Sequence, residues 1–497
     1  MADTPPALAS RRARILAIAA GPLMALACWI ALPDSFTDAT GRAAALPAAA
    51  RATIAMLVWM ATWWMTEAVP LAATSLLPAA TFPLLGIATP AASLSPYAAD
   101  VIFLFLGGFL LAGAMTRWGL DRRIAFTTLR LMGTRSDRVV AGVMLATAFV
   151  SMWVSNTAAA AMMVPIALSL IRLVDEGPQR QRFAAALLLS VAYAASIGGI
   201  ATLVGSPPNG IAARFIASTG GPSITFASWM PIGLPLALLM LPAAWLLLTR
   251  VLFRQAIGPL AGGRALVAAA ARELGPWSRG EAATLTAFVL AVFLWLGSPV
   301  LRDLEWSGIR PFGGMGDAQV AMLAALLLFV WPMERSTGGF ALDWGVASEV
   351  PWGVLLLFGG GLSLAAAIEA NGVTHFVAAG AQGLQGLPEW ANLAVVVGAS
   401  VFVSEVTSNT AQVAATAPLL GGIAPALGID AARLVLASAL GASCAFMMPV
   451  GTPPNAIVFG TGHLSIGQMC RAGFWLNLTG IAVITAYATW WLPYVLR

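Results

Sequence analysis

Long apolar segments separated by short polar loops run along almost the whole chain. Each is close to the length of about 20 residues with which a helix crosses a bilayer. Only 9% of the 497 residues are charged and 59% are hydrophobic, whereas soluble domains carry about 25% charged residues. The pattern predicts an all-α polytopic membrane protein with about 11 transmembrane helices. Their expected positions are residues 14–32, 51–68, 70–88, 99–117, 184–204, 229–251, 281–299, 318–333, 350–369, 431–449 and 472–494.

Two further apolar stretches, residues 139–173 and 391–425, are about 35 residues long and carry a small polar triplet near the middle. This length exceeds one span and is short for two full spans with a loop. Each stretch therefore predicts a re-entrant helical hairpin with its triplet at the tip. Because Ser, Asn and Thr readily begin a helix, Asn156 or Thr157 is expected to start the second arm of the first hairpin, and Asn409 or Thr410 that of the second.

The polar motifs occur twice in the same order, which indicates an internal duplication. Ser155-Asn156-Thr157 matches Ser408-Asn409-Thr410 at an offset of 253 residues. Further on, GSPPN (residues 205–209) matches GTPPN (451–455) at an offset of 246, so a single gap of seven residues separates the two alignments. The first copy holds five predicted spans, and this odd number inverts the second copy. Inverted repeats are a common transporter architecture, in which substrate binds near the midplane where broken helices meet.

The Pro-Pro pairs of GSPPN and GTPPN remove two backbone donors and bar a regular helix. Within a bilayer such a break is tolerated only where the freed backbone faces protein or water, so we expect broken helices that are interrupted near Gly205 and Gly451. The chain then divides into an N-terminal segment with the first span (1–50), a first inverted repeat (51–251) with hairpin 139–173 and broken helix 184–217, a cytoplasmic linker (252–280), and a second inverted repeat (281–497) with hairpin 391–425 and broken helix 431–466.

Arginine supplies all 26 basic side chains, and its distribution sets the expected topology. We place the N-terminus inside and let each hairpin enter and leave on one side. Only seven arginines then lie outside, as the positive-inside rule requires: Arg42, Arg51, Arg214, Arg302, Arg310, Arg433 and Arg497. The C-terminus is then periplasmic or extracellular. The first apolar run resembles a signal peptide, but its length and the many spans that follow favour a retained helix.

The chemistry of the four polar motifs favours an anion and a small cation. None of them contains an arginine or has one immediately beside it. Helix N-termini in a low-dielectric site attract anions through free N–H groups, while hydroxyl, amide and carbonyl oxygens suit Na⁺. The two histidines and three cysteines are scattered, which argues against a metal cluster or a catalytic relay. We therefore expect no enzyme, no organic cofactor and no nucleic-acid partner.

The motifs resemble those of the divalent anion:sodium symporter (DASS) family, the di- and tricarboxylate and sulfate carriers. SMWVSNT, SEVTSNT, GSPPN and GTPPN resemble the two hairpin tips and two unwound loops of that family, and Trp63–Ala80 (WWMTEAVPLAATSLLPAA) resembles its segment near the start of the first repeat. The similarity covers about residues 50–495. It implies a homodimer in which a mobile transport domain slides along a scaffold domain by an elevator movement.

The resemblance also implies site residues. It places one Na⁺ near Ser151, Ser155, Asn156 and Gly205, and a second near Ser404, Ser408, Asn409 and Gly451. It places substrate carboxylates on Asn156, Thr157, Ser206, Asn409, Thr410 and Thr452, with Pro207 and Pro453 beside them.

The chain departs from the family pattern at a few positions. Ala158-Ala159 and Ala411-Gln412 follow the triplets where the family often has Ala-Thr, and Ser404 stands where the family often has Thr. Gln412 could reach the ligand or bond a neighbouring carbonyl. Glu405 could shape its hairpin or help to bind a cation or proton. The position of Glu67 near the predicted inner surface favours a structural role for this residue.

Together these features predict a secondary transporter of a bacterial inner membrane that imports C4-dicarboxylates (succinate, malate or fumarate) with sodium. Its partners are a small dianion, sodium, membrane lipid and a second copy of the chain. The alternatives are a sodium-independent dicarboxylate exchanger, a citrate or sulfate carrier, and a cation/proton antiporter that uses Glu405 or Glu67. An intramembrane enzyme or a receptor is a more distant alternative.

Overall fold

The computed structural model describes residues 11–37, 42–130, 135–254, 263–305, 310–333, 339–380 and 386–496. Part of the expected linker 252–280 and of the N-terminal segment, and Arg497, lie outside these residues. The chain begins with α1 (Arg11–Ala31), the short antiparallel hairpin β1 (Ser35–Thr37) and β2 (Ala43–Ala45), and α2 (Ala48–Thr66). Short helices follow: α3 (Leu71–Thr74), α4 (Leu77–Thr81), α5 (Pro90–Leu94) and the 3₁₀ helix η1 (Ser95–Ala98).

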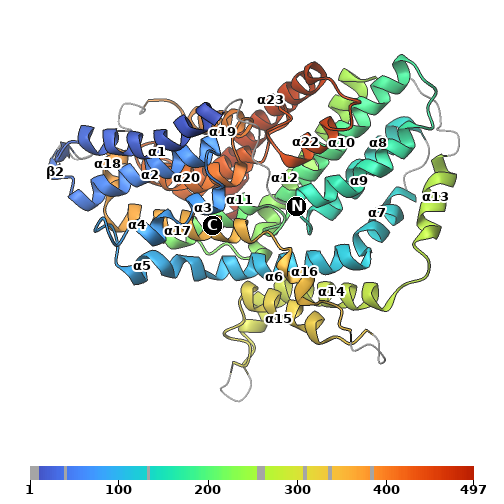
Figure 1. Cartoon of the computed structure of the whole chain (residues 1–497), viewed down its shortest axis with the longest axis horizontal. Coiled ribbons are helices and arrows are strands. Elements are labelled where there is room, and N and C mark those ends of the chain that lie inside the picture. The colour runs from blue at the N-terminus through green and yellow to red at the C-terminus, as the bar shows by residue number, and fades with distance from the viewer. Residues whose placement is uncertain are drawn as a thin grey trace.

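The rest of the first half consists of α6 (Asp100–Trp118), α7 (Leu120–Arg130), α8 (Ser136–Ser151), α9 (Asn156–Ile171), α10 (Pro178–Ala201), α11 (Pro207–Ser218) and α12 (Phe226–Leu246), which continues as the π-helix η2 (Leu247–Leu252). The connection to the second half contains α13 (Gly263–Glu273). In Figure 1, α8, α9, α10 and α12 slant together on the right, whereas α1 and α2 lie on the left.

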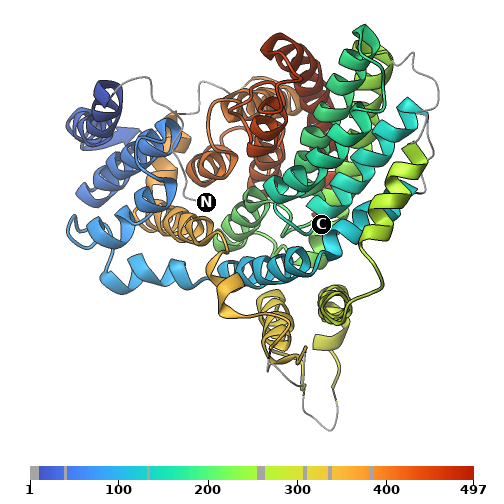
Figure 2. The same cartoon turned by 45° about the vertical axis from the view of Figure 1, so that its right-hand side comes forward.

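The second half contains α14 (Arg279–Arg302), α15 (Asp317–Val330), α16 (Trp344–Ser348), α17 (Trp352–Ala370), α18 (Val373–Gly380), α19 (Glu389–Ser404), α20 (Asn409–Ile423), α21 (Ala431–Ala442), α22 (Pro453–Phe459), α23 (Ile466–Trp490) and α24 (Leu492–Val495). Helices α14 and α15 pack against each other and against α6, and they project below the rest of the molecule in Figure 2.

Seven helical segments of the described residues are long and apolar enough to cross a membrane, which agrees with the polytopic helical fold expected from the sequence. The span expected at 70–88 is not one helix, because prolines at positions 70, 78 and 83 divide it into α3, α4 and a turn. Two features were not anticipated: the β1–β2 hairpin, and the short helices α7 and α18, each of which follows a glycine in the left-handed conformation, Gly119 (φ 73°) and Gly372 (φ 70°).

Equivalent glycines let helices approach closely in both halves. Gly107 of α6 faces the Ala321 backbone of α15, so that an added Cβ would lie 2.6 Å from the Ala321 carbonyl carbon. Gly360 of α17, at the offset of 253, faces Ser75 between α3 and α4, and its added Cβ would lie 2.3 Å from the Ser75 carbonyl oxygen. The two halves therefore repeat this backbone contact as well as their polar motifs.

Replacing Gly107 with alanine should lower thermal stability, because the new methyl group meets backbone that cannot rotate away. Overpacking of this kind costs about 1–3 kcal/mol. The neighbouring Gly108→Ala variant is a matched control, since its added Cβ lies 3.7 Å from the nearest atom, an ordinary contact. The melting temperatures of the purified proteins in detergent measure both effects. Equal melting temperatures for the two variants would contradict the close contact at Gly107.

Polar contacts group the helix ends into two sets. Loops expected inside contact one another through Trp118–Ala341, Arg117–Asp343, Arg250–Asp137 and Arg123–Glu281. Loops expected outside do so through Phe226–Asp317, Asn371–Ile87, Arg433–Glu389 and Tyr487–Pro231. The Arg117 guanidinium lowers the pKa of Asp343, which caps α16. Each contact joins two helix ends or loops that are expected on the same side of the membrane.

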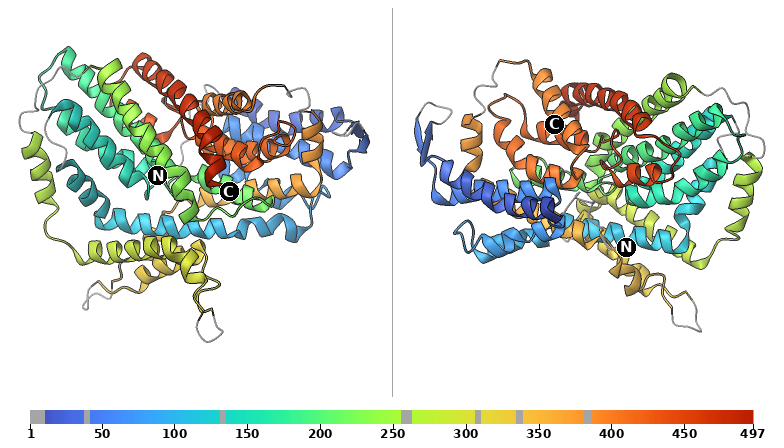
Figure 3. Two further views of the ribbon diagram at one scale, coloured as in Figure 1. Left: turned by 180° about the vertical axis from the view of Figure 1, so that it is seen from behind. Right: turned by 45° about the horizontal axis from the view of Figure 1, so that its top comes forward.

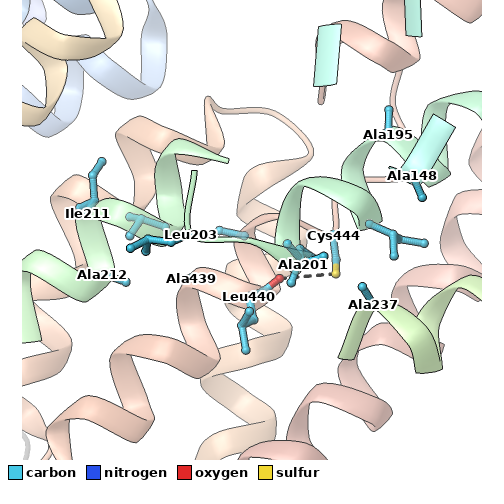
Figure 4. Packing of buried hydrophobic residues seen from close by; sticks show 14 of the residues in the cluster. Ala148, Ala195, Ala201, Leu203, Ile211, Ala212, Ala237, Ala439, Leu440 and Cys444 are labelled. Atoms are coloured by element: carbon cyan, nitrogen blue, oxygen red, sulfur yellow. Dashed lines mark hydrogen bonds between the residues drawn. The ribbon is translucent and has the colours of Figure 1, made fainter. Parts of the chain in front are cut away.

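Small side chains fill the centre of the molecule where the two broken helices meet. Every side chain of α10 from Phe183 to Ala201 is buried, and α10 packs against α8, α9, α12 and α22. Figure 4 shows this region, with alanines from α8, α10, α12 and α21 around Cys444, which donates to the Leu440 carbonyl (3.5 Å). Side chains this small bring the backbones of the helices close together.

Candidate functional site

The first polar triplet lies at the turn between two helices. Helix α8 ends at Ser151 and α9 begins at Asn156, with Ser155 as the N-cap that accepts from the Ala158 N–H (3.3 Å). The buried Ser151 hydroxyl lies 2.7 Å from both the Asn156 Oδ1 and the Ala195 carbonyl oxygen. An added Cβ at Gly199 of α10 would lie 2.4 Å from the Asn156 Oδ1. This tip therefore presents clustered oxygens directly against the end of α10.

The second triplet occupies the equivalent turn. Helix α19 ends at Ser404 and α20 begins at Asn409, with Ser408 as N-cap toward the Ala411 N–H (3.5 Å). The buried Ser404 hydroxyl donates to the Val401 carbonyl (2.7 Å). The Asn409 Oδ1 is buried and has no hydrogen-bond partner among the described residues. A buried acceptor without a partner costs about 1–3 kcal/mol, which a bound ligand would offset.

Both Pro-Pro motifs interrupt a helix. The first break separates α10 from α11, which begins at Pro207, and the second separates α21 from α22, which begins at Pro453. Ser206 is the N-cap of α11 without a side-chain cap bond, so its nearly buried hydroxyl is not used there. Thr452 caps α22 by accepting from the Asn455 N–H (3.3 Å). The N-termini of α9, α11, α20 and α22 are thus formed by the expected residues.

The last residue of each motif has a role that the sequence analysis missed. The Asn209 amide donates to the carbonyls of Gly199 and Thr202, both at 2.9 Å. The Asn455 amide donates to the carbonyls of Ala445 (3.1 Å) and Met448 (3.0 Å). The donor and both acceptors of the second half are therefore equivalent to those of the first half at the offset of 246. Each Oδ1 is buried without a partner among the described residues. The sequence signal that could have shown this role is the asparagine with which both motifs end.

Two different side chains fasten the unwound segments to the hairpin tips. In the first half, the Thr202 hydroxyl lies 2.5 Å from the Met152 carbonyl oxygen and accepts from the Gly205 N–H (3.0 Å). In the second half, the buried Glu405 carboxylate holds the unwound segment to the hairpin tip. Its Oε1 accepts from the N–H groups of Phe446 and Met447 and from the Asn477 amide, and its Oε2 accepts from the Met448 N–H, at 2.7–2.8 Å.

These contacts bear on the three residues whose roles the sequence left open. With four donors around it, Glu405 has little lone-pair capacity left for a cation, so the geometry favours the shaping role. Gln412 is buried and donates to the Ser400 carbonyl (2.9 Å). Of its two possible roles, the structure therefore favours the bond to a neighbouring carbonyl. Glu67 ends α2 in the left-handed conformation (φ 47°).

The second half of each broken helix packs against the hairpin of the other repeat. Helix α11 lies against α20 and α21, and α22 lies against α9 and α10. At one of these contacts, an added Cβ at Gly421 of α20 would lie 2.8 Å from the Phe215 ring of α11. The two views of Figure 3 show the long red helix α23 of the second half beside the green helix α12 of the first half. Both predicted ion sites are thereby parts of one packed unit.

The structure brings several of the predicted site residues close together. Ser151 and Asn156 are in direct contact, and Gly205 lies close to Gly199, since an added Cβ there would be 2.7 Å from the Gly199 carbonyl oxygen. Gly451 lies beside Glu405, with an added Cβ 3.1 Å from Oε2. The hydrogen bonds that hold each tip are made within its own repeat. Thr157 is exposed and Thr410 is partly exposed.

Comparisons with known proteins agree with these observations. Residues 38–496 match the family described as the sodium:sulfate symporter transmembrane region. The sodium-dependent dicarboxylate transporter SdcS of Staphylococcus saprophyticus is 40% identical over 451 residues, which cover 89% of this chain and 86% of that protein. SdcS of Staphylococcus aureus gives the same identity and coverage.

Solved structures share the fold. The YdaH transporter of Alcanivorax borkumensis matches with a TM-score of 0.63 and 15% identity over 97% of this chain and 98% of its own. MtrF of Neisseria gonorrhoeae, from a class of antimetabolite efflux pumps, matches with a TM-score of 0.60 and 13% identity over 98% of this chain and 96% of its own. The family match and the relatives describe transporters, which confirms the expectation of a carrier rather than an enzyme. The chain therefore belongs to the sodium:sulfate symporter family, the divalent anion:sodium symporter family that its motifs predicted.

Proposed function

We propose that this protein is a sodium-coupled importer of C4-dicarboxylates such as succinate, malate and fumarate. The observation that carries the proposal is the pair of oxygen-rich hairpin tips, each fastened to a broken helix of its own repeat. The substrate class is supported by the names of the SdcS relatives, which are sodium-dependent dicarboxylate transporters.

The first proposed sodium site uses Ser151, Ser155, Asn156 and the Gly205 carbonyl; the second uses Ser404, Ser408, Asn409 and the Gly451 carbonyl. The proposal is supported by the Ser151–Asn156 contact and by the unpartnered Asn409 Oδ1. Hydroxyl, amide and carbonyl oxygens are neutral ligands. A bound ion therefore brings a full positive charge that neither site supplies by itself.

The proposed dianion site lies at the N-termini of α9, α20, α11 and α22. Their first residues and N-caps supply Asn156, Thr157, Asn409, Thr410, Ser206 and Thr452, with Pro207 and Pro453 beside them. Free N–H groups at the starts of α9 and α20 stabilise the carboxylates, whereas α11 and α22 begin with Pro-Pro pairs that have no N–H and contribute through their helix dipoles and N-cap hydroxyls. They carry only partial charges, so the remaining charge would be balanced by the two sodium ions. This balance is the physical reason for coupling, because each ligand lowers the cost of placing the other there.

For the transport step we propose an elevator movement of the hairpins and broken helices, which the interleaved packing supports as one rigid unit. Helices α7 and α18, which follow Gly119 and Gly372, would connect this unit to the fixed remainder of the chain. We place the protein as a homodimer in a bacterial inner membrane, with the N-terminus cytoplasmic and the C-terminus periplasmic or extracellular. Lipid would cover the exposed apolar side chains of the spanning helices.

Purified protein in proteoliposomes should take up labelled succinate when an inward sodium gradient is imposed and should not do so when choline replaces sodium. Uptake should not require succinate inside the vesicles. Protein-free vesicles give the background. Uptake that needs internal succinate and ignores sodium would instead identify an exchanger, and the proposed sodium sites would lose their role. If succinate fails while sulfate or citrate is taken up, the substrate class changes but the sodium sites stand.

A further inference from the structure

The two repeats differ at one position beside their hairpin tips. Residue 152 of the first repeat is Met152, and the residue at the offset of 253 in the second is Glu405. Met152 contributes its backbone carbonyl, which the Thr202 hydroxyl contacts. Glu405 contributes a buried carboxylate, and the position equivalent to Thr202 is Met448. A hydroxyl on the broken helix thus fastens the first repeat, whereas a carboxylate on the hairpin fastens the second.

The Glu405 carboxylate fixes three successive peptide groups. It accepts from the N–H groups of Phe446, Met447 and Met448 in the unwound segment between α21 and α22. In a planar trans peptide the carbonyl points opposite to the N–H, so these bonds also set where the preceding carbonyls point. The Ala445 carbonyl is held in turn by Asn455 (3.1 Å). Hydrogen bonds to a carboxylate are about twice as strong as neutral ones.

We infer that Glu405 is a positioning residue that holds the unwound segment 443–452 in its ion-binding shape before any ion arrives. Gly451, whose carbonyl belongs to the proposed second sodium site, lies beside the Glu405 Oε2. The carboxylate also places one full negative charge next to that site, and the first repeat has a neutral group instead. The second site is therefore preformed, and Glu405 sets its affinity for sodium. This inference rests on the proposed function, because it assigns a positioning residue to the second proposed sodium site.

The first test uses Glu405→Gln, which keeps the shape of the side chain and removes its charge. The sodium concentration for half-maximal succinate uptake should rise about tenfold or more, as expected when a charge-assisted network is lost. The succinate concentration for half-maximal uptake, measured at saturating sodium, should change much less. A merely structural role would not separate these two constants. The matched control is Thr202→Val, which removes the neutral fastening of the first repeat and should shift the sodium requirement less.

A second readout needs no transport. Sodium chloride, compared with choline chloride, should raise the melting temperature of the wild-type protein in detergent, and Glu405→Gln should need more sodium for the same rise. If Glu405→Gln does not fold, Asn477→Leu removes one of the four donors and should shift the sodium requirement in the same direction, by a smaller factor. An unchanged sodium requirement in the variant that folds would overturn the inference. No sodium effect on the wild-type protein would instead overturn the proposed function.

Discussion

Replacing Asn156 or Asn409 with alanine is expected to abolish sodium-driven succinate uptake while leaving the protein folded. Each asparagine is the first residue of a hairpin arm and is proposed to contact both an ion and the dianion. Loss of a hydrogen bond to a charged group costs about 1.5–3 kcal/mol. Because the ion and the anion each help the other to bind, two such losses multiply. Uptake should fall by about a hundredfold or more.

Asn371→Ala is the matched control for these variants. Asn371 is also an asparagine at a helix end, but its amide donates to Thr53 and to the Ile87 carbonyl, outside the hairpins. Its loss should lower stability modestly and leave the sodium requirement unchanged. Uptake by proteoliposomes, normalised to the amount of folded protein by size-exclusion chromatography, measures all three variants. Normal uptake by Asn156→Ala or Asn409→Ala would rule out the proposed site.

The parts of the site that the sequence predicted share one physical cause. A polar triplet or a Pro-Pro pair in the middle of an apolar segment conflicts with a lipid-facing helix, so the positions of both turns and both breaks are visible without coordinates. The helix starts at Asn156, Asn409, Pro207 and Pro453 follow from N-cap and proline preferences. The duplication strengthened each assignment, because chance does not repeat polar motifs in the same order.

What the sequence did not predict depends on contacts between distant residues. Asn209 and Asn455 stand in motifs that were recognised, but only the fold shows that their amides hold carbonyls at the end of α10 and in the unwound segment after α21. The three peptide groups around Glu405 are about 40 residues further along the chain. Helices α7 and α18 have only 11 and 8 residues, which is at or below the shortest window in which helical periodicity can be read.

Helices α7 and α18, which follow the equivalent glycines Gly119 and Gly372, make different contacts in the two repeats. Arg123 of α7 and Phe376 of α18 are equivalent at the offset of 253. Arg123 is held by Glu281 at the start of α14, whereas the Phe376 ring packs edge-on against Phe36 of β1 with centroids 5.4 Å apart. Helix α7 is thus attached to the first turn of α14, and α18 is attached to the strand between α1 and α2.

Arg123→Ala should destabilise the protein strongly. The Arg123 and Glu281 side chains are only 14% and 5% exposed, and Arg123 also donates to the carbonyls of Leu274, Gly275 and Pro276. Removing one partner leaves a nearly buried charge unpaired, which costs about 3–5 kcal/mol. The free energy of unfolding in detergent should therefore fall by about 3 kcal/mol. Uptake should also fall, because α7 loses its attachment to α14.

The double variant Arg123→Gln with Glu281→Gln separates charge pairing from shape. It removes both charges and keeps side chains that can still hydrogen-bond, so it should be more stable than either single glutamine variant. In a double-mutant cycle the interaction between the two positions should be well above the few tenths of a kcal/mol that separate independent sites. Additive losses would mean that Arg123 acts mainly through the three carbonyls and the Trp277 ring, 4.9 Å from its guanidinium carbon. Phe376→Ala, in the equivalent helix α18, should lower the free energy of unfolding without coupling to Glu281.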